Sequence, residues 1–270
     1  MKGNTRKLVI KIGTSTLTDI SGRHKIAVFE KLAHVISAIH DLGYEVVLVS
    51  SGAVAVGRHQ LAADIASKQA AAAVGQYQNV IAYEKAFAKY DKMLGQVLVS
   101  TNDFISEEQR ENFSQTLEIL LKSRVIPIVN ENDVISDNSA SQNRLFTDND
   151  MLAAIVATLC RAQKLIILSD IDGLYDKNPR GTANAKLIQN VKKIDDKIIS
   201  FASGAGSNRG TGGMITKLKA AKFATNYGVE TIITNGNNLD SLYRIIRNEP
   251  VGTTFQSCQK TTTSQQGQLS

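Results

Sequence analysis

The stretch KLVIKIGTSTLT, residues 7–18, decides the fold class. Apart from the lysines at positions 7 and 11, its first six residues are apolar and mostly β-branched, which is typical of a strand covered on both faces. Glycine, serine and threonine residues follow the strand at once, beginning with Gly13. In open α/β sheets, ligands bind beyond the carboxyl ends of the strands. The stretch therefore predicts a central strand that ends at a polar binding site.

The same alternation of strand and helix continues along the chain. Further strands are expected at residues 45–50, 95–100, 125–130, 164–169 and 229–234. Helices are expected over residues 28–39, 62–90 with a break near Gly75, 107–122, 150–161, 214–227 with Gly228 as C-cap, and 239–247. Continuous apolar strands separated by helices predict the α/β class, as a three-layer αβα sandwich around a mainly parallel central sheet.

No linker and no internal repeat interrupts this pattern. Residues 1–256 are therefore expected to form one domain. Residues 257–270 are polar and low in complexity, and we expect them to form a disordered tail.

The composition of the 270 residues excludes several classes of protein. The formal net charge is +6, but the basic residues are scattered, which favours anionic small molecules over nucleic acid as ligands. Cys160 and Cys258 lie far apart, which fits a reducing cytoplasm better than a disulfide. No apolar run approaches the ~18 residues that a membrane helix needs. We expect a soluble cytoplasmic protein that binds neither nucleic acid nor membranes.

Two lysines suggest phosphate chemistry. Lys11 stands in an apolar strand, where an ammonium is costly unless it meets an anion; the alternative is an edge strand with Lys11 in water. RGTGGMITK, residues 209–217, places three glycines before a helix, so free amides and the helix dipole favour an anion there. Lys217 would lean back toward this loop, unless the loop is only a flexible surface segment. The stretch matches neither the Walker A nor the dinucleotide fingerprint. Phosphoryl transfer without a Walker A motif follows as a hypothesis.

Polar residues also follow the other strands. SSGA at 50–53 offers hydroxyls and a helix start, although an ordinary serine cap would look the same. NEND at 130–133 and DND at 148–150 could supply metal ligands, partners for an ammonium, or helix caps. The four histidines lack the spacing of a zinc site, and no G-x-S-x-G elbow is present.

Several of these motifs occur together in one known family. VIKIGTSTLT, VSSGAVAVG, PIVNENDVIS, DNDMLAAIVA, LSDIDGLYDKNPR and GTGGMITKLKAA follow one another in order between about Lys7 and Thr254. In this set the chain resembles the amino acid kinase family and, within it, the glutamate 5-kinases. The combination of NEND, DND and GTGGM-x-TK is what separates that branch from aspartate, uridylate and carbamate kinases.

The resemblance implies an activity and its partners. ATP would phosphorylate the side-chain carboxylate of L-glutamate to give γ-glutamyl phosphate and ADP, the first step of proline biosynthesis. It further implies Mg²⁺ with the ATP and no direct protein ligand to the metal. It also implies a cytoplasmic homo-oligomer (dimer or tetramer), feedback inhibition by L-proline, and hand-off of the product to glutamyl phosphate reductase.

The resemblance also implies roles for individual residues. Lys11 and Lys217 would stabilise the phosphoryl group in transit, and Asp150 would organise the two lysines. The residues that would bind glutamate are Ser51, Gly52, Ala53, Asp133 and Asn149. Those that would bind ATP are Lys11, Ser169, Asp170, Thr211, Gly212, Gly213, Met214, Ile215, Thr216 and Lys217.

The sequence departs from the family pattern at a few places. We expect the chain to lack the C-terminal PUA domain that many relatives carry. SDNSASQNRL, residues 136–145, is longer and more polar than in the family, where substrate and inhibitor are recognised. Thr147 stands where glycine is common, and Ser169 stands where threonine is common.

Two other functions stay open at this point. One is a kinase for another carboxylate such as N-acetylglutamate, although Asp133 suits a free α-ammonium that this substrate lacks. The other is a non-catalytic sensor of amino acids or nucleotides, against which the presence of Lys11, Asp150 and Lys217 speaks.

Overall fold

A computed structural model describes residues 6–61, 67–135, 148–179, 181–182, 184–203 and 213–257 of the chain. Its centre is a sheet of strands in the order β3-β4-β2-β1-β5-β7-β8-β6. The strands are β1 (Lys7–Ile12), β2 (Glu45–Val49), β3 (Leu94–Val99), β4 (Ile126–Glu131), β5 (Lys164–Ser169), β6 (Asn190–Val191), β7 (Glu230–Asn235) and β8 (Thr253–Phe255).

The sheet is mainly parallel, as the sequence predicts. Strand β1 pairs in parallel with β2 on one side and β5 on the other, which makes it a central strand. Of the strand pairs in the described ranges, β7 with β8 is the antiparallel one. All six residues of β1 are buried, and this explains why its sequence is almost continuously apolar.

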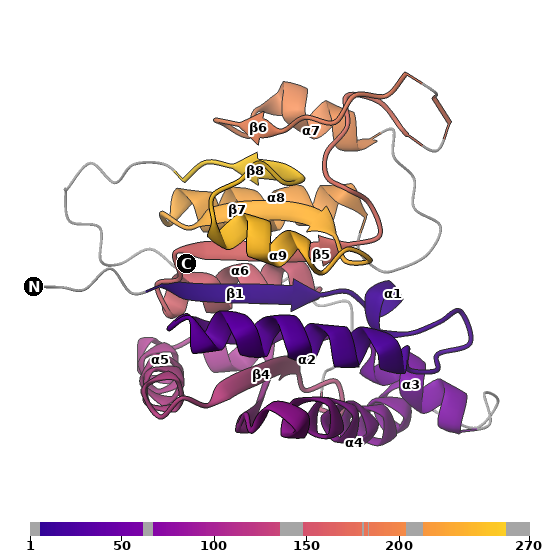
Figure 1. Cartoon of the computed structure of the whole chain (residues 1–270), viewed down its shortest axis with the longest axis vertical. Coiled ribbons are helices and arrows are strands. Elements are labelled where there is room, and N and C mark those ends of the chain that lie inside the picture. The colour runs from indigo at the N-terminus through magenta and orange to yellow at the C-terminus, as the bar shows by residue number, and fades with distance from the viewer. Residues whose placement is uncertain are drawn as a thin grey trace, which may run out of the picture.

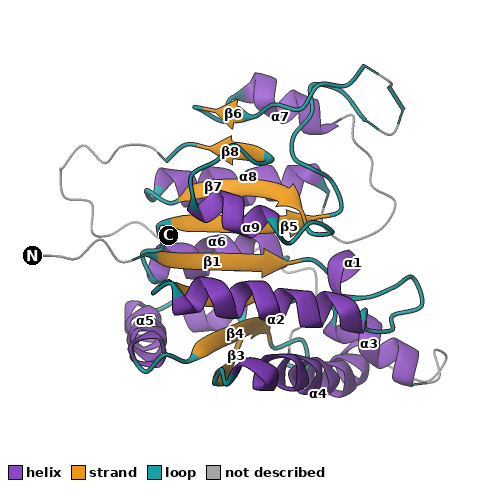
Figure 2. Cartoon of the chain, viewed as in Figure 1, coloured by secondary structure: helices purple, strands orange, loops and turns teal. Residues whose placement is uncertain are grey.

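Helices cover both faces of the sheet, which confirms the αβα sandwich (Figures 1 and 2). One apolar core packs α2 (Ile26–Asp41), α4 (Lys68–Phe87) and α9 (Ser241–Ile246) against the sheet. The other core packs α5 (Glu107–Lys122), α6 (Asn149–Leu159) and α8 (Met214–Asn226) against the opposite face. The shorter helices are α1 (Thr14–Leu17), α3 (Ala53–Gln60), α7 (Asp196–Ser203) and the 3₁₀ turns η1 (Ala88–Tyr90) and η2 (Thr101–Phe104).

The expected break near Gly75 is wrong. Helix α4 runs without interruption from Lys68 to Phe87. Gly75 is instead the place where α3 approaches α4: a Cβ on Gly75 would lie 1.7 Å from the carbonyl oxygen of Ala53. Gly57 faces Ala71 from the other side in the same way. The glycines therefore serve close helix packing rather than a bend.

The C-cap of α8 is Tyr227, one residue before the expected Gly228; Gly228 follows it with a φ of +85°, the left-handed conformation that glycine favours after a helix. The sequence analysis did not foresee the separate helices α1, α3 and α7 or the short strands β6 and β8. Within the described ranges, no helix is both long and apolar enough to cross a membrane. Of the expected tail at 257–270, residues 258–270 lie outside the described residues.

Candidate active site

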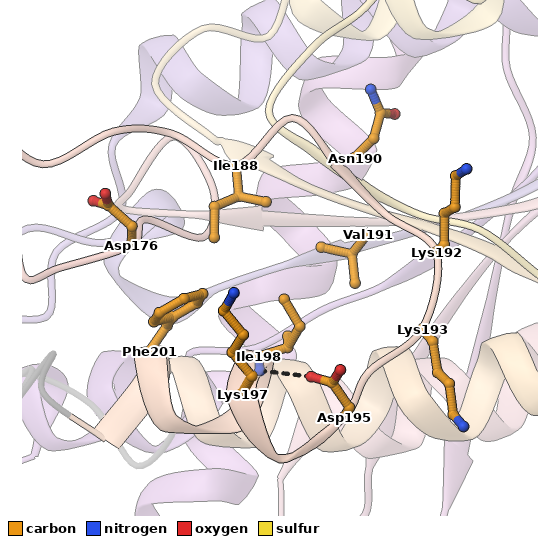
Figure 3. A pocket seen from close by; sticks show the side chains of 10 residues that line it. All are labelled: Asp176, Ile188, Asn190, Val191, Lys192, Lys193, Asp195, Lys197, Ile198 and Phe201. Carbon is orange, nitrogen blue, oxygen red and sulfur yellow. Dashed lines mark hydrogen bonds between the residues drawn. The ribbon is translucent and has the colours of Figure 1, made fainter.

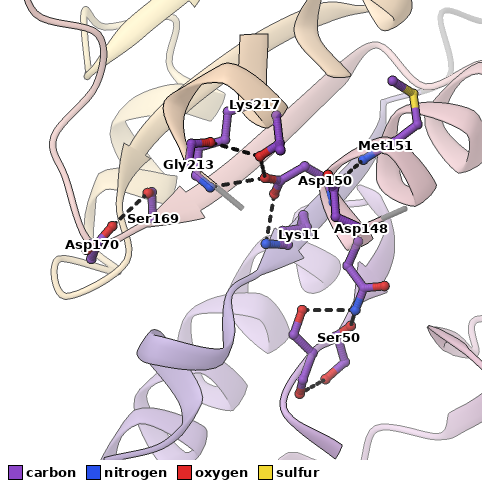
Figure 4. Close-up of polar contacts among 12 residues, drawn as sticks. Lys11, Ser50, Asp148, Asp150, Met151, Ser169, Asp170, Gly213 and Lys217 are labelled. Atoms are coloured by element: carbon purple, nitrogen blue, oxygen red, sulfur yellow. Dashed lines mark hydrogen bonds and ion pairs between the residues drawn. The ribbon is translucent and has the colours of Figure 1, made fainter. Parts of the chain in front are cut away.

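Lys11, Asp150 and Lys217 form a cluster of buried charges (Figure 4). The Nζ atom of Lys11 lies 2.8 Å from Oδ1 of Asp150. The Nζ atom of Lys217 lies 3.0 Å from Oδ2 of the same carboxylate. The structure thus brings together the two lysines that the sequence analysis placed on one phosphoryl group, with an acid between them.

Local structure explains how these three side chains meet. Lys11 alternates with Val9 along β1, so it points toward the face covered by α6 and α8, at the carboxyl end of the strand. Asp150 is in the first turn of α6, and Lys217 is in the first turn of α8. The α6 start is fixed by Asp148, whose Oδ1 accepts hydrogen bonds from the amides of Asp150 and Met151.

The electrostatics of the cluster favour an ionised Asp150. Burial would raise its pKa, but the charges and hydrogen bonds of Lys11 and Lys217 outweigh burial and lower it to about 2. A carboxylate with such a pKa is not a base at neutral pH. Since two ammonium groups share one carboxylate, the cluster keeps one net positive charge, which suits an incoming phosphate.

Thr216 and Gly213 complete this side of the cluster. The Oγ1 atom of Thr216 lies 3.1 Å from Oδ2 of Asp150 and 2.8 Å from the carbonyl oxygen of Gly213. Gly213 precedes α8 and provides no side-chain cap, so the helix presents its first amides as donors. Met214 is buried in the apolar core, whereas Ile215 is exposed. Thr211 and Gly212 lie outside the described residues.

A second polar group surrounds Asn149, the residue before Asp150. Its Nδ2 atom lies 2.6 Å from the carbonyl oxygen of Ser50, 3.0 Å from Oγ of Ser51 and 3.0 Å from Oδ1 of Asn130. Three predicted motifs, SSGA, NEND and DND, thus meet at one amide. Since Asn149 and Asp150 are adjacent on α6, this polar group adjoins the lysine cluster.

The other predicted residues lie around these two groups. Gly52 has a φ of +95°, a left-handed conformation that favours glycine, and Ala53 begins α3. Asp133 forms an ion pair with Lys68. At the end of β5, the hydroxyl of Ser169 donates to Oδ1 of Asp170. The segment at 136–145 and Thr147 lie outside the described residues.

Sequence reasoning missed the contribution of α4 and its neighbour His24. Gln76 accepts a hydrogen bond from Asn130, and buried Asn79 donates to the carbonyl oxygen of Ser51. His24 lies 2.7 Å from the Oδ1 atom of Asn79. A signal existed: Gln76 and Asn79 are three residues apart, hence on one face of an otherwise alanine-rich helix.

Within the described ranges, no three His, Cys, Asp or Glu side chains lie close enough together to hold a metal ion. A separate hollow of about 520 Å³ lies beside β6 and α7 (Figure 3). Its lining combines apolar side chains with three lysines at positions 192, 193 and 197 and two aspartates at positions 176 and 195. The hollow shares no lining residue with the cluster of Lys11, Asp150 and Lys217, so it is a separate feature of the surface.

Sequence comparison agrees with this architecture. The sequence profile of the amino acid kinase family matches residues 6–235, which span β1 to β7 and include the whole lysine cluster. The chain belongs to the amino acid kinase family. The fold class and the mostly parallel sheet that the described residues form are those of this family.

Curated relatives narrow the position within the amino acid kinases. The glutamate 5-kinase of Clostridium perfringens is 46% identical, with 93% of this chain and 96% of the relative covered. The glutamate 5-kinase of Lactiplantibacillus plantarum is 42% identical, with 94% of this chain and 98% of the relative covered. A longer glutamate 5-kinase, from Caldanaerobacter subterraneus, is 44% identical, but this chain covers 67% of it. The chain thus matches the relatives of its own length almost end to end.

Solved structures show the same fold at lower identity. Carbamate kinase from Giardia lamblia bound to AMP-PNP superposes with a TM-score of 0.69 at 18% identity, over 94% of this chain and 99% of that chain. UMP kinase from Bacillus anthracis gives a TM-score of 0.64 at 16% identity, over 93% and 96%. At such identities these neighbours establish the fold of this family member and nothing finer.

Proposed function

We propose that this amino acid kinase is a glutamate 5-kinase, which uses ATP to phosphorylate the side-chain carboxylate of L-glutamate and so begins proline biosynthesis. Full-length similarity to curated glutamate 5-kinases, at 42% to 46% identity, supports the choice of substrate. The observation that carries the chemistry is the convergence of Lys11 and Lys217 on one buried carboxylate. This arrangement offers charge neutralisation without a covalent nucleophile, which is what phosphoryl transfer requires.

The reaction would proceed by direct transfer. An oxygen of the glutamate γ-carboxylate forms a bond to the γ-phosphorus of ATP, and the bond from that phosphorus to the bridging oxygen breaks, releasing ADP. Lys11 and Lys217 bind the oxygens of the moving group, where negative charge is concentrated. Asp150 holds both ammonium groups in place. No general base is needed, because the attacking carboxylate is already ionised at neutral pH.

The residues around the cluster divide between the two substrates. Ser51, Gly52, Ala53, Asp133 and Asn149 bind glutamate, with Asp133 facing its α-ammonium. Ser169 and Asp170 contact the nucleotide, and the loop and helix start from Thr211 to Lys217 wrap its phosphates. Mg²⁺ accompanies ATP, because this ion keeps several waters and is bound largely through the phosphates of the substrate.

The proposed function includes a cellular location, an oligomeric state, an inhibitor and a partner enzyme. It works in the cytoplasm as a homo-oligomer, is inhibited by L-proline, and passes γ-glutamyl phosphate to glutamyl phosphate reductase. These points follow from the family resemblance.

The test is an ADP-release assay with ATP, Mg²⁺ and a panel of acceptors: L-glutamate, N-acetylglutamate, carbamate and UMP. Hydroxylamine added to the mixture should trap the acyl phosphate as a hydroxamate. We expect glutamate-dependent ADP release with equal hydroxamate, and a lower rate when proline is added. ADP release with another acceptor and none with glutamate would overturn the proposed substrate. Tight ligand binding without turnover would instead indicate a sensor.

A further inference from the structure

An ion pair joins the start of α4 to the loop after β4, the strand whose Asn130 accepts a hydrogen bond from Asn149. The Nζ atom of Lys68 is 2.9 Å from Oδ1 of Asp133. Lys68 is the first residue of α4, and Asp133 is three residues beyond Asn130. The side chain of Asp133 is 16% exposed and that of Lys68 is 41% exposed. Since neither group is fully buried, Lys68 can exchange Asp133 for another anion.

The two charges match the two charges of a free amino acid. An α-amino acid carries an ammonium and a carboxylate on one carbon, and the pair presents an anion and a cation at hydrogen-bond distance from each other. We propose that Lys68 binds the α-carboxylate of glutamate while Asp133 binds its α-ammonium; this inference rests on the proposed function. The lysine–aspartate contact is then exchanged for two contacts to the substrate.

The energetic cost of this exchange is small. A partly exposed lysine–carboxylate pair contributes little to stability, so breaking it costs little. A charge-assisted hydrogen bond to a substrate carboxylate contributes more than such a pair. The positive end of the α4 helix dipole adds to the attraction at this position.

The structure also ties Lys68 to the rest of the site. Gln76, further along α4, accepts a hydrogen bond from Asn130, and Asn130 in turn accepts one from Asn149. Helix α4 is therefore joined to the end of β4 by Gln76 with Asn130, and to the loop after β4 by Lys68 with Asp133. A substrate whose γ-carboxylate points to the lysine cluster would have its α-carbon on the Asp133 side.

The test compares Lys68→Met with the wild-type enzyme. We expect the KM for glutamate to rise about 10- to 100-fold, which corresponds to one lost charge-assisted hydrogen bond. The kcat and the KM for ATP should change less than threefold, because the lysine does not touch the moving phosphoryl group. Lys68→Arg should recover most of the affinity. Lys85→Met, an exposed lysine on the same helix, is the matched control and should leave the KM for glutamate unchanged.

A substrate analogue separates recognition of the α-carboxylate from a general effect on the site. L-isoglutamine keeps the α-ammonium and the γ-carboxylate but has a neutral amide in place of the α-carboxylate. L-isoglutamine should inhibit the wild type and Lys68→Met with the same inhibition constant, measured against glutamate. If it inhibits neither protein, binding requires the α-carboxylate, which also supports the proposal. A KM for glutamate within threefold of wild type in Lys68→Met, or weaker isoglutamine binding in that variant, would overturn it. If the wild type itself does not turn over glutamate, the proposed function fails instead.

Discussion

Lys11 and Lys217 are bound to opposite oxygens of the same carboxylate, although one lies near the end of β1 and the other in the first turn of α8, far along the chain. Two ammonium groups repel each other, and both are almost fully buried. Asp150 offsets that repulsion and fixes the separation of the two Nζ atoms. The fold can therefore hold two buried positive charges close together, which is what the proposed phosphoryl transfer requires.

Replacing Lys217 with alanine should abolish most turnover. The variant loses one of the two ammonium groups that, in the proposed mechanism, stabilise the transferring group, so we expect kcat to fall by a factor on the order of 10²–10³. Asp150 keeps Lys11 as its partner, so the fold should persist, as thermal unfolding monitored by circular dichroism will show. The matched control is Lys219→Ala, an exposed lysine on the same helix, which should keep wild-type kcat. Near-normal turnover in Lys217→Ala would refute the role assigned to this residue.

Replacing Asp150 with asparagine should reduce both activity and stability. Asparagine keeps the shape of the side chain but leaves two buried ammonium groups without a counter-charge, which costs about 3–5 kcal/mol. Urea unfolding at pH 7 measures this loss. ATP with Mg²⁺ should raise the melting temperature of the variant more than that of the wild type, because its phosphates replace the missing negative charge. An equally stable variant would show that Asp150 does not hold the lysines together.

The low pKa of Asp150 predicts how this stability depends on pH. Its pKa is about 2 in the folded protein, against 3.8 for an ordinary aspartate, so ionisation stabilises the fold above about pH 4. The contribution, about 2 kcal/mol, is lost as the pH falls toward 2. The difference in unfolding free energy between the wild type and Asp150→Asn should therefore shrink by about this amount between pH 5 and pH 2. A constant difference would mean that the folded pKa is not lowered.

The sequence was sufficient to predict the parts of the site that local patterns encode. Lys11 is a charge within an apolar strand, and Lys217 follows a glycine loop at a helix start. Each of these local patterns predicts an anion-binding residue. For Asn149 and Asp133, the family resemblance predicts a role in binding glutamate. These residues lie at the ends of strands and helices, where the direction of a side chain follows from the element itself.

The contributions of α4 could not be predicted, because they depend on how two helices pack. Gln76 and Asn79 mark a polar contact on a buried helix face, but the partners are set by the position of α3 against α4. That position depends on Gly57 and Gly75. From the sequence alone, Gly75 indicates a break instead, because glycine is disfavoured inside a helix. Strand β8 has three residues and pairs antiparallel with β7, and so short a strand shows no periodic sequence pattern from which it could be predicted.

Replacing Gly75 with alanine should destabilise the protein, although alanine is the better helix former. The new Cβ would lie 1.7 Å from the carbonyl oxygen of Ala53, so α3 must move. We expect a loss of about 1–3 kcal/mol or more in unfolding free energy. Ala73→Gly, at an exposed position of the same helix, should cost only about 1 kcal/mol from helix propensity. Since Ser51 and Gly52 precede α3, Gly75→Ala should also raise the KM for glutamate more than the KM for ATP. A stabilised Gly75→Ala variant would contradict the observed packing.

Asn79 should act as a positioning residue for Ser51. Its Nδ2 atom donates to the carbonyl oxygen of Ser51 at 3.3 Å, and its Oδ1 atom faces Nε2 of His24 at 2.7 Å. Asn79→Asp keeps the shape but removes the amide donor, so the Ser51 carbonyl would face an anion. Loss of one buried hydrogen bond costs about 1–3 kcal/mol, and we expect the KM for glutamate to rise about tenfold with the KM for ATP unchanged.

His24 provides the matched comparison for Asn79, because it hydrogen-bonds the Oδ1 atom of the same amide whose Nδ2 atom donates to Ser51. His24→Gln retains a donor for Oδ1 of Asn79 and should keep the KM for glutamate within about threefold of wild type. His24→Leu removes the donor, so the Asn79 amide can rotate away from Ser51, and the KM for glutamate should rise further than in His24→Gln. Steady-state kinetics in both substrates measures this. Equal kinetics in the two His24 variants would show that the side chain of Asn79 is held by its own burial and not by His24.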